Sequence, residues 1–180
     1  MTDSKSISIA TSLVPGRDIE LQSLATKSWR AHGFQVTALN AASEIANVRK
    51  QFPDSLSIAA ERTAEKAVGK PLPFVIDLLR TATAQNPTAR VIGFLNSDIL
   101  LRSQCDLARI LIEHASSAAI LLPRVDISDI RSAEGYRPTG QETYSIGYDG
   151  IFCHPICLPV FPTACFVLAC RSGTIGCHWC

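Results

Sequence analysis

The sequence lacks the basic runs that nucleic-acid-binding proteins carry. Its 180 residues have a formal net charge of +1, and no run of lysine or arginine exceeds two residues. The adjacent pair Arg49-Lys50 is typical of the solvated end of a helix. Phosphate backbones are bound mainly through clustered lysine and arginine, so we expect no nucleic-acid partner.

Long hydrophobic runs are also missing. A helix that spans a bilayer needs roughly 18 or more consecutive apolar residues. The longest candidate, residues 151–170, contains His154 and prolines that would interrupt a helix. Residues 1–6 are polar and lack the apolar core of a signal peptide. These absences predict a protein without a membrane span and with a cytoplasmic location.

Cysteine is scarce in the body of the chain. Of the seven cysteines, only Cys105 precedes residue 150, and the other six fall within residues 153–180. An odd count without a signal peptide argues against a disulfide framework.

Short apolar segments alternate with amphipathic segments over most of the sequence. We expect strands near residues 6–13, 34–39, 55–59, 91–95 and 118–122, and helices near 18–32, 41–51, 72–84 and 103–115. Strands separated by single helices indicate right-handed crossovers and a mainly parallel sheet. The sequence therefore predicts an α/β fold with three layers and a mostly parallel sheet.

After Pro123 the alternation stops. Residues 124–140 are polar and predict a long loop, and residues 144–152 predict a strand that returns at an edge of the sheet. We expect one domain, residues 1–162, that is incomplete at its carboxyl-terminal end.

The segment Asn96-Ser97-Asp98 follows directly on the apolar run 91–95. A carboxylate at the carboxyl end of a strand in an open α/β sheet faces the crevice where ligands bind. Magnesium and manganese are often held there by one or two carboxylates together with substrate phosphates. The alternative is structural, since Asn96 and Asp98 also suit a turn or a helix cap.

Two other segments are candidates for a binding site. Lys70, in Gly69-Lys70-Pro71, precedes a predicted helix, whose amino terminus would help it to bind phosphate oxygens. The alternative is an exposed lysine in a turn. Asp149, in Gly147-Tyr148-Asp149-Gly150, suits the rim of a site or, equally, a plain hairpin turn with its carboxylate in solvent.

Taken together, these segments resemble the nucleotide-sugar transferases of the A-type glycosyltransferase fold, and within them a family 2-like group. The resemblance covers roughly residues 6–162. It rests, in chain order, on residues 7–13, on 22–29 with their Ser28-Trp29, on Gly69-Lys70-Pro71, on 95–100 and on Gly147-Tyr148-Asp149.

The resemblance implies a glycosyltransferase that binds a nucleotide-sugar donor over its amino-terminal half and transfers the sugar to an unknown acceptor. It implies that Asp98 is the ligand of a divalent metal, manganese or magnesium. Thr11 and Ser12 would line the nucleoside pocket, and Lys70 and Asn96 would contribute to cofactor binding. Asp149 would be a catalytic group on the acceptor side. Asn96 stands where many relatives have a first aspartate.

The composition changes from Thr163 onward, and residues 172–180 have no periodicity. Members of this family carry a Trp-Asp-Tyr-Trp-Leu-Pro-like motif beyond the Gly-aromatic-Asp segment. Codons for residues 172–180 can be chosen, with free third bases, so that they also encode Trp-Asp-Tyr-Trp-Leu-Pro-Leu-Val when they are read one register over. We therefore expect residues 163–180 to be an out-of-frame tail of a truncated transferase, possessing weak activity or none.

The alternative interpretation takes the tail as genuine coding sequence. The pairs Cys153/Cys157 and Cys177/Cys180, together with His154 and His178, are loosely spaced as ligands of a structural zinc site. The protein would then be a small non-enzymatic α/β binding domain with a carboxyl-terminal zinc module.

Overall fold

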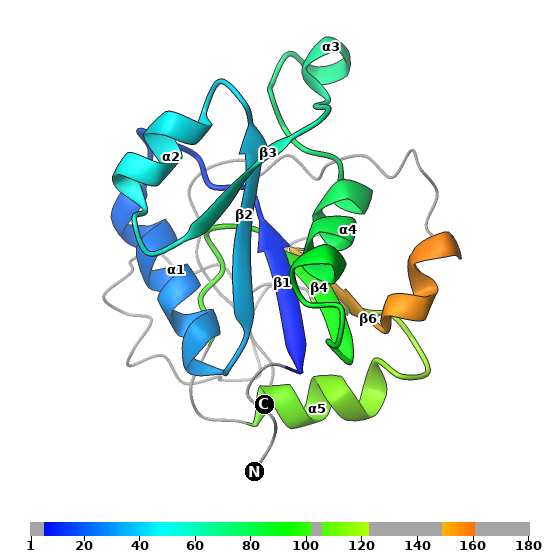
Figure 1. Ribbon diagram of the computed structural model, residues 1–180. Coiled ribbons are helices and arrows are strands. Elements are labelled where there is room, and N and C mark those ends of the chain that lie inside the picture. The colour runs from blue at the N-terminus through cyan, green and yellow to red at the C-terminus, as the bar shows by residue number, and fades with distance from the viewer. Residues whose placement is uncertain (1–5, 102–105, 123–148, 161–180) are drawn as a thin grey trace, which may run out of the picture.

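The structure is a computed structural model, and it describes residues 6–101, 106–122 and 149–160 (Figure 1). The strands are β1 (Ile7–Thr11), β2 (Gln35–Ala41), β3 (Leu56–Ala60), β4 (Val91–Leu95), β5 (Ile120–Leu122) and β6 (Gly150–Cys153). The helices are α1 (Ile19–Ala31), α2 (Ile45–Gln51), α3 (Glu65–Val68), α4 (Val75–Gln85), α5 (Leu107–His114) and a 3₁₀ helix, Pro155–Val160.

The described strands form one sheet in the order β3-β2-β1-β4-β6-β5. Strands β1 to β4 are parallel, and β6 runs antiparallel to both β4 and β5. The predicted α/β class with a mostly parallel sheet is therefore confirmed.

The prediction of an edge strand over 144–152 is wrong in its position. Strand β6 lies inside the sheet, between β4 and β5, and Phe152 and Cys153 are fully buried. A strand covered on both faces has apolar residues at consecutive positions, as β6 does, whereas an edge strand with one wet face alternates.

Two apolar clusters pack on opposite faces of the sheet and make three layers, with α1 and α4 on opposite sides in Figure 1. On one face, Ile7 and Ile9 of β1 contact the cluster that contains Trp29 of α1 and Leu111 of α5. On the other face, Ala10 joins the cluster of α4. This arrangement follows from the alternation of successive strand side chains between the two faces.

Helix α4 begins at Val75, three residues later than the sequence predicts. Phe74, the residue before the helix, has extended backbone (φ −75°, ψ 147°). A residue that precedes a proline is biased toward extended conformations, and Pro71 and Pro73 therefore delay the start of the helix. Lys70 consequently lies five residues before α4 and not at its first turn.

Helix α5 begins at Leu107, where the side chain of Asp106 accepts a hydrogen bond from the backbone N–H of Arg109 (3.1 Å). Such a side-chain cap satisfies one of the free donors of the first turn. The sequence places this start near residue 103, but residues 102–105 lie outside the described part of the chain.

Within the described residues, the helices are all too short or too polar to cross a membrane. The predicted loop 124–140, Gly147-Tyr148 and the tail 163–180 lie outside the described residues, so these predictions stay predictions.

Candidate functional site

The strand order reverses between β1 and β4. The chain leaves β1 toward β2 and β3 on one side and returns to β4 on the other side. In open α/β sheets, ligands bind beyond the carboxyl ends of the strands at such a reversal. The residues that follow these two strand ends are Ser12 and Asn96, so the fold itself marks this position as the candidate site.

A small recess opens at this reversal. It holds about 50 Å³, so it accommodates only part of a ligand. Its walls come from the loop after β1, the approach to α4 and the end of β4. They are formed by Ser12, Val14, Leu72, Pro73, Val75, Leu78, Phe94, Leu95, Asn96 and Ser97. Most of this lining is apolar, and Ser12, Asn96 and Ser97 supply its polar groups.

The two motifs singled out in the sequence, 53 residues apart, meet at this recess. The side-chain amide Nδ2 of Asn96 donates to Oδ1 of Asp149 (2.8 Å). The backbone N–H of Asn96 donates to the carbonyl oxygen of Asp149, also at 2.8 Å. The antiparallel pairing of β4 with β6 creates this contact, because it places Leu95 opposite Gly150.

Asp98 and Asp149 are both buried carboxylates. Asp98 is 8% exposed and Asp149 is 5% exposed. A buried charge is costly unless hydrogen bonds, an opposite charge or a metal compensate it. For Asp149, the Asn96 amide provides one such hydrogen bond.

Asp98 lies in a four-residue turn, Asn96–Ile99, which we call the Asp98 turn. It is closed by a hydrogen bond from the backbone N–H of Ile99 to the carbonyl oxygen of Asn96 (3.2 Å). In the part of the chain that the structure describes, no group of three or more His, Cys, Asp or Glu side chains could hold a metal ion. A complete protein cage is thus not found there, whereas one carboxylate that shares a cation with ligand phosphates needs no such group.

The other predicted site residues have different surroundings. Thr11 is fully buried, and its hydroxyl donates to the carbonyl oxygen of Leu95 (2.7 Å), so it ties β1 to β4. Ser12 lines the recess. Lys70 is exposed and does not line the recess, although Leu72 and Pro73 just after it do.

Two buried amide side chains to which the sequence assigns no role, those of Gln22 and Asn40, shape the loop after β1. The Gln22 side chain accepts from the backbone N–H of Val14 (2.7 Å) and donates to its carbonyl oxygen (3.0 Å). Asn40 does the same for Leu13, at 3.2 and 2.6 Å. The helical spacing of the sequence could have indicated that Gln22 is buried, because it places this polar residue on the same face as Ala25 and Trp29.

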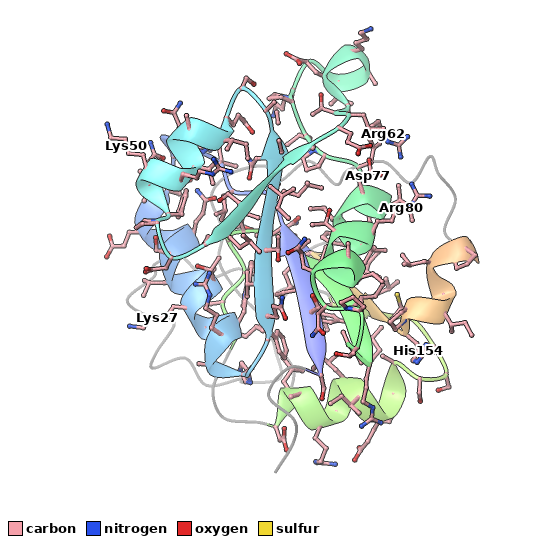
Figure 2. All side chains as sticks on the ribbon, viewed as in Figure 1. Lys27, Lys50, Arg62, Asp77, Arg80 and His154 are labelled. Carbon is pink, nitrogen blue, oxygen red and sulfur yellow. The ribbon has the colours of Figure 1, made fainter. Side chains whose placement is uncertain are left out.

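An ion pair fastens the connection between β3 and α4 beside the recess. Arg62 makes two hydrogen bonds to the carboxylate of Asp77 (2.8 and 3.0 Å), and Arg80 lies 3.6 Å from the same carboxylate (Figure 2). The hydrogen bond and charge of Asp77 raise the pKa of Arg62. The Arg62 guanidinium also lies over the ring of Phe74, 4.7 Å from its centre. These contacts hold the chain at Arg62 against Phe74 and the first turn of α4.

Two cysteines of the alternative zinc site, Cys153 and Cys157, lie within the described residues. Cys153 is fully buried, and burial, with a smaller contribution from nearby Cys157, raises the pKa of its thiol to about 12. Cys177, His178 and Cys180 lie outside the described residues, and the zinc prediction stays untested there.

We expect Cys153 to resist iodoacetamide in the folded protein at pH 9, because its pKa of about 12 leaves little thiolate. The same shift has a consequence for stability. The folded thiol holds its proton more tightly than the unfolded one, whose ordinary pKa is 9.0, so stability falls as the pH rises from about 9 toward 12. Labelling followed by peptide mass spectrometry, with and without urea, measures the reactivity. Rapid modification of Cys153 without urea would contradict its burial.

No protein-family model matches this sequence, and no curated protein matches it either.

Proposed function

We propose that the protein is a glycosyltransferase that binds a nucleoside-diphosphate sugar and a divalent cation at the recess. The observation that carries the proposal is the meeting of the Asp98 turn with Asp149 at the reversal of strand order. A ligand crevice is expected at that position in an open α/β sheet. Asn96 and Ser97 line the recess, Asp98 follows them in the chain, and Asp149 is hydrogen-bonded to Asn96.

The described residues fit a divalent cation in one arrangement. Asp98 would be a single hard oxygen ligand, one residue after Ser97, which lines the recess. Magnesium and manganese bind readily through one carboxylate and substrate phosphates. When bound, such a cation neutralises charge on the leaving diphosphate.

The positions of the other residues at the recess suggest roles in binding the donor and the acceptor. The apolar wall of Pro73, Val75 and Phe94 suits the face or edge of a planar ring, and Ser12 supplies a hydroxyl beside it. The amide of Asn96 fixes one oxygen of Asp149. A carboxylate held in this way is suited to orient an acceptor hydroxyl toward the sugar.

The proposal is tested by thermal unfolding with manganese and, in turn, uridine, guanosine and thymidine diphosphates. A diphosphate at about 100 times its dissociation constant is expected to raise the melting temperature by about 5–10 °C. Asp98→Asn is expected to abolish this shift. Asp54→Asn, which changes an exposed carboxylate in the turn before β3, is the matched control and should keep it. Absence of a shift with every diphosphate, or an undiminished shift in Asp98→Asn, would overturn the proposal.

A further inference from the structure

Helix α1 holds the chain immediately after Asp98. The indole Nε1 of Trp29 donates to the carbonyl oxygen of Ile99 (2.7 Å), and Trp29 itself is fully buried. One residue earlier on the helix, the hydroxyl of Ser28 accepts from the backbone N–H of Leu101 (3.0 Å). Figure 1 shows the segment after β4 running beside α1.

The Asp98 turn is thus restrained at both ends. On the β4 side, Asn96 is bonded to Asp149 through its backbone and its side chain. On the α1 side, Ile99 and Leu101 are bonded to Trp29 and Ser28. Asp98 lies between these anchors, so its position relative to the recess depends on both.

The same face of α1 also restrains the opposite wall of the recess. Gln22, two turns before Trp29 on the helix, holds both backbone groups of Val14, which lines the recess. One rigid helix therefore sets the loop after β1 and the turn after β4. The position of Val14 relative to the Asp98 turn therefore depends on that helix.

We infer that Ser28 and Trp29 are positioning residues that hold the Asp98 turn in the geometry needed to bind a metal–diphosphate ligand. This inference rests on the function proposed above. The Ser28-Trp29 pair acts on the site indirectly, through the Asp98 turn. Neither side chain lines the recess.

The test uses a matched pair of serines on α1. The Ser28 hydroxyl donates to the carbonyl oxygen of Ala25 and that of Ser23 donates to the carbonyl oxygen of Ile19, each at 2.7 Å. Only Ser28 also receives a hydrogen bond from Leu101. Ser28→Ala is expected to weaken binding of manganese with a nucleoside diphosphate by about five- to tenfold, the value of one hydrogen bond. Ser23→Ala should bind as the unaltered protein does, and Ser28→Thr, which keeps the hydroxyl, should restore binding.

Trp29→Phe is a second variant that removes the indole donor and keeps an aromatic ring in the core. It is expected to weaken binding by a similar factor. Equal binding by Ser28→Ala, Ser23→Ala and Trp29→Phe would overturn the inference while leaving the proposed function intact.

Amide hydrogen exchange gives a readout that needs no ligand. In Ser28→Ala, the amides of residues 97–101 should exchange faster than in Ser23→Ala, because the partner of the Leu101 N–H is lost. If the unaltered protein binds no diphosphate, the proposed function fails. Unchanged exchange over 97–101 in Ser28→Ala would then also overturn the positioning role.

Discussion

Gly93→Ala is expected to lower the free energy of unfolding by about 3 kcal/mol, the upper end of the cost of overpacking a core. A Cβ atom added to Gly93 would lie 2.5 Å from the carbonyl oxygen of Ile151 and 2.7 Å from the ring of Phe152. The first of these atoms belongs to the backbone of β6, so the clash is relieved only by moving β6 away from β4. Because the β4–β6 pairing brings Asn96 to Asp149, the substitution disturbs the core and the site together.

Urea denaturation measures this loss, and Gly69→Ala is its control. Gly69 has a left-handed backbone (φ 68°), but a Cβ atom there meets nothing within 4 Å. Its replacement is expected to cost only about 1 kcal/mol from the backbone conformation. Equal losses in the two variants would show that Gly93 does not set the spacing of β4 and β6.

Asn96→Asp is expected to destabilise the protein at pH 7 by about 2–3 kcal/mol. The change deletes the amide that donates to Asp149 and places a second carboxylate next to its Oδ1, where the amide nitrogen lay 2.8 Å away. A lost hydrogen bond to a buried charged group costs about 1.5–3 kcal/mol, and like charges in contact add to it.

The loss in Asn96→Asp should depend on pH. Two adjacent carboxylates raise the pKa of one of them in the folded state, so the folded variant binds more protons than the unfolded chain. Its stability should therefore recover as the pH falls toward 5 and decrease again as the pH rises. Asn47→Asp adds the same charge at an exposed position of α2 and is the control. A loss in Asn96→Asp that is independent of pH would contradict the close approach of residues 96 and 149.

The parts of the fold that local sequence predicts are those with strong local signals. The apolar run 91–95 forms β4 with the predicted bounds, and the alternation of strands and helices gives the parallel order of β1 to β4. The turn at Asn96–Ile99 also follows from local residue preferences, since asparagine and aspartate favour turns.

Features that depend on long-range pairing escaped prediction. The interior position of β6 depends on its pairing with both β4 and β5. The residues of β6 alone do not indicate which strands it pairs with. For the same reason, the hydrogen bond between Asn96 and Asp149 could not be foreseen, although both residues were candidates. The hydrogen bond from the Thr11 hydroxyl to Leu95, 84 residues away, depends on strand pairing in the same way.

The resemblance to A-type-fold glycosyltransferases remains the source of the proposed chemistry. The structure adds a reason why these residues belong together, namely the reversal of strand order with its recess and the Asn96–Asp149 contact. It also shows what Gln22, Ser28 and Trp29 contact: these three side chains hold the loops around that position.

We propose that a nucleoside diphosphate and its divalent cation bind at the recess, which takes up part of the ligand, with the cation on Asp98. The most direct test is a crystal of the protein grown with manganese and a nucleoside diphosphate, with anomalous scattering recorded to locate manganese. The account predicts an anomalous peak in contact with the Asp98 carboxylate and diphosphate density between that peak and Ser12. A peak elsewhere, for example beside His154 and Cys157, or no peak at saturating manganese, would contradict it.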